Sequence, residues 1–517
     1  MLELTCPNAA AAWLKSRITG KLQTDSRVVS AGDGFLAWPG ATTDPRQYVD
    51  QVLNKGAAAC LVELAGSERY QFKDPAIAGY QNLKASSGLI AAAYFENPTE
   101  QLDVVAITGT NGKTSTAWWL ASALSSLKQG NPIPCGFVGT LGIGRMRRVD
   151  DDGSLKLDFF ASGLTTPNPI LLQQGFRKFV DAGLRACALE ASSIGINEHR
   201  LDGTRIRTAV FTNFTQDHLD FHGTMRAYWE SKLRLFRWPG LRAAVVNLDD
   251  AKGDELVREL NASAVDEIDV WSVSCEQPAR LRAQDVTHND QGLSFTVVED
   301  HTHLIVNTRL IGDFNVSNLL GVIASMRIFG VALGDCVAAC ETLRGVPGRM
   351  ESQGGSGCYP LVVVDYAHTP DAVSKALTSL RQVANRRGGR LWCVLGCGGD
   401  RDASKRPLIG SIAAQLSDHL TVTSDNPRSE SAQSIADQII AGVLNPGTVG
   451  VQLDRALAIC DAVGSADPKD IVLVAGKGHE DYQEILGLKR PFSDQLQVKL
   501  ALQARAPAAT SSPQVCR

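Results

Sequence analysis

The stretch VVAITGTNGKTSTAW, which begins at Val104, constrains the fold more than any other part of the chain. It predicts a buried strand, a glycine turn and the start of a helix, in that order. Gly109 and Gly112 let backbone N–H groups turn toward a phosphate, and the helix adds its positive end. The common nucleotide loop has a glycine five positions before the glycine of GK[ST], but here that position is Ile107. The stretch therefore predicts a phosphate-binding loop whose motif is shorter than the common one.

The two residues after Gly112 suit a nucleoside triphosphate. Lys113 supplies a point charge for the β- and γ-phosphates, and Thr114 can offer its hydroxyl to a magnesium ion. The alternative is a plain glycine turn between a strand and a helix. The combination of strand, GTNGKTST and helix favours the phosphate-binding interpretation.

The whole chain predicts an α/β protein of three domains, since 517 residues at about 150 per domain give three. Residues 1–100 end at the turn signal ENPTE. In residues 101–345, apolar strands such as ACALEA and TAVFTN alternate with helical stretches, which predicts a mostly parallel sheet with helices on both faces. In residues 346–517, each apolar strand runs into a Gly, Asp or Asn turn. The tail from about Arg505 is predicted to be disordered.

Composition excludes several classes of protein. The net charge of −4 does not indicate a nucleic-acid-binding protein. No apolar run approaches the ~20 residues that span a bilayer, so no membrane partner is expected. The N-terminus does not have the pattern of a signal peptide. The 12 cysteines are scattered and form no convincing zinc motif, so we expect reduced thiols in a cytoplasmic protein.

Polar residues follow two strands of the second block. Glu190 ends the strand ACALE, and Asp217 and His218 follow the strand AVFTNF. Functional loops of such sheets gather at the carboxyl ends of the strands, so these side chains can converge on the phosphate loop. Each could also be an ordinary loop charge or a hydrogen-bonded polar residue. The residue types alone leave both interpretations open.

Taken together, the motifs resemble those of the Mur ligases, the ATP-dependent amide-forming enzymes of peptidoglycan precursor synthesis. The order is TGTNGKTST, LEASS, FTNFTQDHLDFHG, SKLRLF, GDFNVSN, GRME, DYAHTPD and GKGHE, and the resemblance covers roughly residues 20–495. It implies a central P-loop ATPase-type parallel-sheet domain, flanked by an N-terminal UDP-binding α/β domain and a C-terminal Rossmann-like domain. It also implies a monomer that uses ATP, Mg²⁺ and a UDP-N-acetylmuramoyl dipeptide.

The resemblance assigns roles residue by residue. The implied ATP contacts are Gly109, Thr110, Asn111, Gly112, Lys113, Thr114, Ser115, Asn315, Arg349 and Asp365. The implied metal ligands are Thr114, Glu190, His218 and Lys232, of which His218 and Lys232, with Lys113, are also the implied catalytic residues. In this family the lysine that matches Lys232 is carbamylated by CO2. By residue type alone, a helical lysine is a solvated surface charge.

The two other substrates have their own implied contacts. Those for the UDP-muramoyl peptide are Thr24, Ser26, Thr165, Thr166, Ser192, Glu198 and Arg200. The loop SDNPR resembles the family's motif for meso-diaminopimelate, with Arg428 as its key residue. The implied pocket is Arg401, Asp425, Asn426, Pro427, Arg428, Gly476 and Glu480. Asp-Asn-Pro is also a strong turn signal, so a plain turn is the alternative.

The sequence departs from the family pattern at three places. Ile194 stands where many relatives have His, Glu198 stands where Gln is expected, and Thr42 and Thr43 replace a His-Gln pair. A carboxylate at 198 would repel an anionic substrate unless it is protonated or paired. These departures bear on the UDP-substrate contacts and leave the ATP contacts unaffected.

Two rival functions are alternatives to this assignment. A folylpolyglutamate-synthase-like ligase shares the loop and the carbamylated lysine, but the TDSR stretch and the DNPR loop argue against it. A non-catalytic nucleotide-sugar-binding protein would keep the fold, but intact Lys113, Glu190, His218 and Lys232 argue against that.

Overall fold

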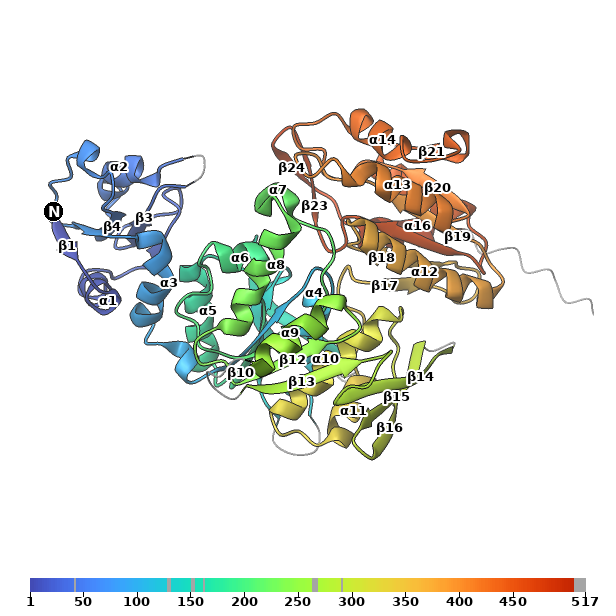
Figure 1. Cartoon of the computed structure of the whole chain (residues 1–517). Coiled ribbons are helices and arrows are strands. Elements are labelled where there is room, and N and C mark those ends of the chain that lie inside the picture. Colours follow the sequence, from blue (N-terminus) through green and yellow to red (C-terminus); the bar gives the residue numbers. More distant parts are fainter. Residues whose placement is uncertain are drawn as a thin grey trace, which may run out of the picture.

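The computed structural model describes residues 1–40, 43–127, 132–149, 154–160, 163–262, 268–289 and 292–505. Thr42 and most of the predicted disordered tail, residues 506–517, lie outside these ranges. The chain forms three sheets in sequence order, each covered by helices, and they appear as three lobes in Figure 1. The predicted α/β class with three successive sheets is confirmed. The domain limits near residues 100 and 345 stay predictions.

The N-terminal lobe holds a parallel sheet in the order β1-β5-β4-β3-β2. Its strands are β1 (Leu2–Leu4), β2 (Leu22–Gln23), β3 (Gly34–Ala37), β4 (Ala59–Glu63) and β5 (Ile77–Tyr80). Its helices are α1 (Pro7–Lys15), α2 (Val49–Asn54) and α3 (Leu83–Tyr94). Apolar clusters lie on both faces of the sheet, so α1 and α3 cover one face and α2 the other.

The central sheet has the order β16-β15-β14-β13-β12-β11-β6-β10-β7-β8-β9. Its strands are β6 (Asp103–Thr108), β7 (Cys135–Gly139), β8 (Gly142–Val149), β9 (Ser154–Phe160), β10 (Ala186–Glu190), β11 (Ile206–Phe211), β12 (Ala243–Asn247), β13 (Asp269–Ser274), β14 (Leu281–Asn289), β15 (Gly292–Glu299) and β16 (Thr302–Asn307). The strands from β14 to β7 run parallel, as the alternation of strands and helices predicted. Antiparallel hairpin strands extend both edges, which makes the sheet mixed.

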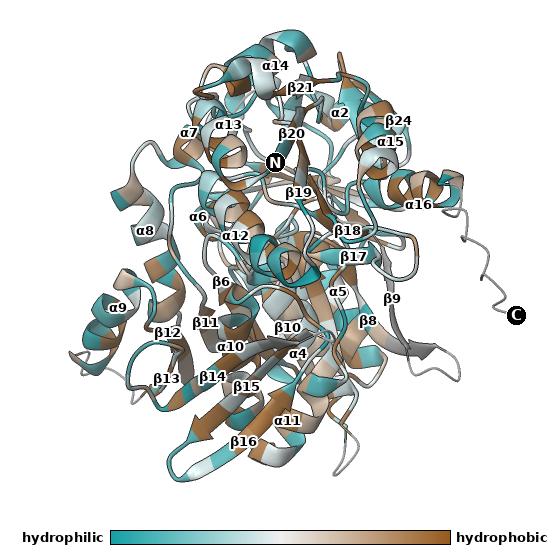
Figure 2. Cartoon of the chain, turned by 90° about the vertical axis from the view of Figure 1, so that its right-hand side faces the viewer, coloured by the Kyte–Doolittle hydropathy of each residue, from teal (hydrophilic) through white to brown (hydrophobic). Residues whose placement is uncertain are grey.

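Helices cover both faces of the central sheet. Those on one face are α4 (Lys113–Ser125), α10 (Phe314–Ile328) and α11 (Leu333–Glu341). Those on the other are α5 (Pro169–Asp181), α6 (Ser193–Asn197), α8 (Met225–Leu233) and α9 (Ala251–Ala262), with the short α7 (Leu219–His222) beside α8. Alternate residues of β6 point into the two cores, because successive side chains of a strand face opposite ways. Figure 2 shows the buried strands as apolar.

The third sheet has the order β17-β18-β22-β19-β20-β21, parallel except for β17. Its strands are β17 (Glu351–Gly354), β18 (Leu361–Asp365), β19 (Leu391–Leu395), β20 (His419–Val422), β21 (Gly450–Val451) and β22 (Ile471–Ala475), with a separate hairpin of β23 (Tyr482–Ile485) and β24 (Leu488–Pro491). One face carries α12 (Pro370–Arg387), α13 (Lys405–Leu416) and α14 (Ala432–Ile440), and the other carries α15 (Arg455–Ser465) and α16 (Asp494–Ala504). Among the described residues, no helix is long and apolar enough to cross a membrane.

Candidate active site

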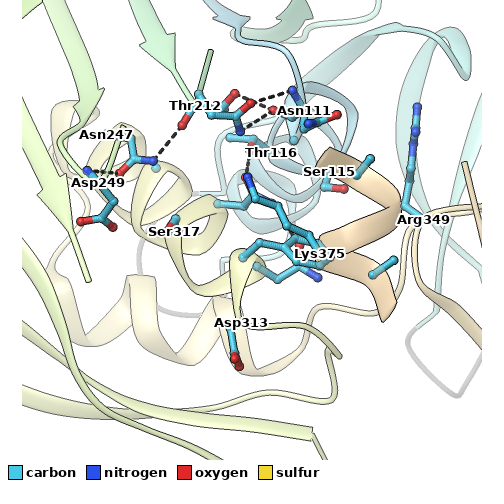
Figure 3. Close-up of a pocket in the computed structure, with 18 of the residues that line it drawn as sticks. Asn111, Ser115, Thr116, Thr212, Asn247, Asp249, Asp313, Ser317, Arg349 and Lys375 are labelled. Atoms are coloured by element: carbon cyan, nitrogen blue, oxygen red, sulfur yellow. Dashed lines mark hydrogen bonds between the residues drawn. The ribbon is translucent and has the colours of Figure 1, made fainter. Parts of the chain in front are cut away.

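A cavity of about 490 Å³ lies at the carboxyl ends of the central parallel strands, between the central and third sheets. The phosphate loop, the ends of β11 to β13 and the start of α10 line it from the central side. Arg349 and Lys375 line it from the third-sheet side (Figure 3), as does Asp365. The site thus lies where the parallel strands end, as the sequence predicted.

The predicted phosphate loop is present, with β6 ending at Thr108 and α4 beginning at Lys113. Gly109 has φ of +150°, and a Cβ there would lie 1.9 Å from Oγ1 of Thr212. Gly112 has φ of +85°, and a Cβ there would meet the side chain of Asn318 at 2.4 Å. Both positions therefore require glycine. The backbone N–H groups of Thr110 and Asn111 donate to Asn213, whereas Gly112 and Ser115, at the N-terminus of α4, line the cavity, which suits a polyphosphate.

Two lysines point at the same loop carbonyl. Nζ of Lys113 donates to the carbonyls of Gly109 at 2.9 Å and Thr110 at 2.8 Å. Nζ of Lys232 donates to the Gly109 carbonyl at 2.7 Å, and the Lys232 side chain is only 1% exposed. Burial, and then the charge of Lys113, hold the pKa of Lys232 well below its ordinary value. The Lys232 amine is thus neutral more often than that of a surface lysine.

Glu190 is completely buried at the end of β10 and faces the start of α4. Its carboxylate accepts from the hydroxyl of Thr114 at 2.9 Å, and from the backbone N–H and hydroxyl of Thr140 at 2.8 and 3.1 Å. Burial raises its pKa, against the opposing effects of the Thr140 N–H and of Lys113. The predicted pairing of Glu190 with the phosphate loop is therefore present in the geometry.

His218 contacts residues other than those that hold Glu190. Its Nε2 is 3.6 Å from Oδ2 of Asp217, and Nε2 of His368 is 4.0 Å from the same oxygen. Burial lowers the pKa of His218 to about 4, so the imidazole is neutral at neutral pH. Within the described residues, no three His, Cys, Asp or Glu side chains are close enough together to hold a metal ion. The predicted metal set stays a prediction.

The three predicted ATP contacts beyond the loop all line the cavity. Arg349 donates to the Thr114 hydroxyl at 3.3 Å and lies 4.3 Å from the centre of the Tyr366 ring. Asp365 accepts from the backbone N–H groups of Met350 and Ala367 at 2.7 and 2.8 Å. Asn315 lies inside the first turn of α10 and does not cap the helix.

The predicted UDP-substrate residues fall into two groups. Thr165, Thr166, Ser192 and Arg200 lie together beside β10: the Thr166 hydroxyl is 2.9 Å from Oγ of Ser192, and Arg200 donates to the Thr166 carbonyl at 3.1 Å. Thr24 and Ser26 follow β2 in the N-terminal lobe, and no contact joins them to the first group among the described residues.

Glu198 has a partner that the sequence did not reveal. Its carboxylate lies 2.6 Å from Nζ of Lys84, which is on α3 of the N-terminal lobe. The charge is therefore compensated across the two lobes, and the repulsion expected of an unpaired carboxylate at this position is removed.

The predicted diaminopimelate residues gather at the carboxyl ends of the third sheet. Asn426 donates to Glu480 at 2.7 Å, and the fully buried Lys477 donates to Asn426 at 3.0 Å and to Glu480 at 3.1 Å. Arg428 has φ of +52° and donates to the Gly399 carbonyl at 2.6 Å. Arg401 is exposed beside Arg428, on the loop that contains Gly398. Asp425, Pro427 and Gly476 complete the same loops.

Comparison with known proteins identifies the family to which this architecture belongs. The Mur ligase middle domain matches residues 107–326, and the glutamate ligase domain of Mur ligases matches residues 348–478. UDP-N-acetylmuramoyl-L-alanyl-D-glutamate–2,6-diaminopimelate ligase of Acidovorax sp. strain JS42 is 53% identical over 97% of this chain and 98% of its own length. The chain belongs to the Mur ligase family.

Solved structures agree with this placement. A structure of a UDP-N-acetylmuramoyl-L-alanyl-D-glutamate–2,6-diaminopimelate ligase matches with a TM-score of 0.62, 32% identity and coverage of 94% of both chains. A folylpolyglutamate synthase of Mycobacterium tuberculosis, complexed with ADP and AMPPCP, matches at 18% identity with a TM-score of 0.60, over 82% of this chain and 96% of its own. The second similarity shows a shared fold alone.

Sequence reasoning missed several residues of this Mur ligase site. Lys477 lies within the GKGHE motif, but nothing in the motif indicated that its side chain turns inward. Thr140 holds Glu190 and follows β7, so its place at a strand end was the available signal. Asn247, the last residue of β12, and Asp249, which follows that strand, also line the cavity.

Proposed function

We propose that this Mur ligase joins meso-2,6-diaminopimelate to the D-glutamate of UDP-N-acetylmuramoyl-L-alanyl-D-glutamate, with conversion of ATP to ADP and phosphate. The observation that carries the proposal is the 53% identity, over nearly the whole chain, to a ligase of that name. The clustered Asn426, Arg428 and Glu480 give this reading a pocket of suitable chemistry. In this role the protein belongs to peptidoglycan precursor synthesis.

The reaction takes two steps. First, an oxygen of the D-glutamyl γ-carboxylate attacks the γ-phosphorus of ATP, and the bond from that phosphorus to ADP breaks, which gives an acyl phosphate. Next, the amine of diaminopimelate attacks the acyl carbon, the carbon–oxygen bond to phosphate breaks, and the amine loses a proton. Positioning and charge neutralisation are the protein's main contributions. Lys113, which contacts the carbonyls of the phosphate loop, and Arg349, which contacts Thr114, are the cations that would neutralise the phosphate charge.

The donor chemistry near the loop fits Mg²⁺. The buried Glu190 carboxylate and the Thr114 hydroxyl supply hard oxygen ligands 2.9 Å apart, and His218 is a neutral imidazole. Thr114 and Glu190 would therefore hold the ion, and His218 is the third ligand that the family resemblance implies. When bound, Mg²⁺ neutralises charge on the phosphates.

Lys232 has the surroundings that carbamylation requires. A neutral amine attacks the carbon of CO2, a nitrogen–carbon bond forms and a proton is lost, so the cation is replaced by an anion. Burial and Lys113 lower the pKa of Lys232 and favour the neutral amine, against a smaller opposing effect of Asp217. Among the described residues, no carboxylate forms an ion pair with Nζ of Lys232, which donates to a backbone carbonyl instead. The resulting carbamate would be attracted to Lys113 and could support a metal ion on the phosphate side.

The remaining assignments concern the two other substrates. The UDP-muramoyl dipeptide extends from Thr24 and Ser26 in the N-terminal lobe to Thr165, Thr166, Ser192 and Arg200 beside Glu190, which places its carboxylate end near the phosphate loop. The pair of Lys84 and Glu198 joins the two lobes that carry these groups. The protein acts as a monomer in the cytoplasm, where ATP is available.

Diaminopimelate differs from lysine by one carboxylate on its far end. The Arg428 guanidinium can bind that carboxylate through two parallel hydrogen bonds, and Glu480 can accept from the distal ammonium. A bound lysine would leave Arg428 without this partner, so we expect discrimination of up to roughly 10⁴-fold.

The test is ADP formation by the purified chain with the UDP-muramoyl dipeptide and a panel of amino acids. We expect turnover with meso-diaminopimelate and very little with L-lysine. Turnover with a folate substrate and glutamate would support the folylpolyglutamate alternative instead. Binding of the UDP dipeptide without any ATP turnover would support a non-catalytic binding protein.

A further inference from the structure

Helix α12 of the third lobe lies against the nucleotide cavity and touches the central lobe at two points. Near its start, Asp371 accepts a hydrogen bond from the side-chain amide of Asn111 at 2.9 Å. Gln382, about three turns further along, donates to Asp313 at the start of α10 at 3.3 Å. Asp371, Lys375, Thr378 and Gln382 are spaced by four, three and four residues and so share one face of α12. Lys375 and Thr378, in the middle of that face, line the cavity.

The first contact involves a phosphate-loop residue. Asn111 lines the cavity, and its backbone is fixed because its N–H donates to Asn213 at 2.8 Å and its carbonyl accepts from Thr212 at 2.6 Å. The side-chain amide of Asn111 is thus the group left to bind a ligand, and it is already hydrogen-bonded to Asp371.

Asp371 holds a second donor as well. Nζ of Lys375, one turn further along α12, lies 3.1 Å from the Asp371 carboxylate, and Lys375 lines the cavity (Figure 3). The side chain of Asp371 is 28% exposed and that of Lys375 is 43% exposed, so both can move. A carboxylate at the edge of a phosphate-binding loop repels a polyphosphate, whereas the amide and the ammonium attract it.

We propose that Asp371 is an internal anion that occupies Asn111 and Lys375 until the polyphosphate of an adenine nucleotide displaces it. The contact between Asn111 and Asp371 is then an autoinhibitory latch on the nucleotide cavity, and Lys375 is a nucleotide-binding cation supplied by the third lobe. This inference rests on the proposed ATP site. It adds that nucleotide entry must break a contact between the two lobes.

A latch of this kind fixes the sign of a mutational effect. When only the open state binds, the apparent dissociation constant is the intrinsic one divided by the open fraction, so weakening the latch tightens binding. A residue that merely stabilises α12, or that helps to hold the nucleotide, would weaken binding or leave it unchanged when replaced.

The experiment is calorimetric titration of the full chain with AMP-PNP and Mg²⁺. We expect Asp371→Ala to lower the dissociation constant roughly tenfold and Asp371→Asn, which keeps an acceptor oxygen, roughly threefold. Lys375→Gln should raise it roughly threefold or more. Asp437→Asn is the matched control, because Asp437 accepts from Gln433 at 2.8 Å on α14 and does not line the cavity. Its constant should not change.

The outcomes separate this inference from the proposed function. Weaker or unchanged binding by both folded Asp371 variants, with normal binding by the wild type, would overturn the latch alone. If the wild type itself bound no adenine nucleotide, the proposed ATP site would fail first. Thermal unfolding of each variant establishes that it is folded before its constant is compared.

Discussion

Two lysines of this chain are almost completely buried, and their surroundings differ. Lys232, 1% exposed, donates to one backbone carbonyl and lies near the cationic Lys113. Lys477, 0% exposed, donates to Asn426 and to the Glu480 carboxylate. Burial of an ammonium without a counter-charge is costly, whereas a paired and hydrogen-bonded ammonium is tolerated. This difference supports the proposed carbamylation of Lys232 and a role of Lys477 in positioning its neighbours.

Replacing Lys232 should have the largest effect. We expect Lys232→Ala to lower kcat by at least ~100-fold, because the proposed carbamate, which would support the metal, cannot form. The substitution should lower the free energy of unfolding no more than the truncation of a buried uncharged side chain would, since it breaks no ion pair. ADP formation and denaturant unfolding measure the two quantities. Near wild-type turnover would make Lys232 a structural residue.

Replacing Arg428 tests the proposed amino-acid-binding pocket, to which Lys477 also belongs. Arg428→Ala should raise the Michaelis constant for diaminopimelate by roughly 100-fold and leave that for ATP within about twofold, because a bidentate contact to one carboxylate is removed. Arg428→Lys keeps the charge but loses the fork geometry, so it should be intermediate. An equal rise for both substrates in steady-state kinetics would contradict the assignment.

Lys477→Met should behave unlike Lys232→Ala. It leaves the Glu480 carboxylate, 18% exposed, without its cation, so we expect a loss of about 3 kcal/mol in the free energy of unfolding. The Michaelis constant for diaminopimelate should rise roughly tenfold while kcat changes less. A variant of unchanged stability that lost kcat instead would reverse the roles of the two lysines.

The smallest effect concerns His479, beside Lys477. Its Nδ1 has no partner among the described residues, and burial lowers its pKa to about 3 from an ordinary 6.5. The unfolded chain therefore takes up a proton first. His479 contributes stability above pH 6.5, and this contribution is lost as the pH falls from 6.5 toward 3. In denaturant unfolding, His479→Phe should reduce that loss by about 2 kcal/mol. If the free energy of unfolding of His479→Phe fell with pH as that of the wild type does, the result would contradict this prediction.

The sequence predicted local features better than partnerships. The GTNGKT loop, its flanking strand and helix, and the ends of β10 and β11 followed from residue spacing, because they depend on neighbours in the chain. The pair of Lys84 and Glu198 joins two lobes, so no local pattern could reveal it. The burial of Lys232 depends on how α8 packs on the central sheet, and by type alone a helical lysine reads as a surface charge.

The claim that Lys232 carries chemistry and Lys477 does not is tested most directly by carbon-13 NMR of the protein equilibrated with ¹³C-bicarbonate. We predict one carbamate signal in the wild type, lost in Lys232→Ala and retained in Lys477→Met. A wild type without the signal, or a Lys232→Ala variant that kept it, would contradict the claim.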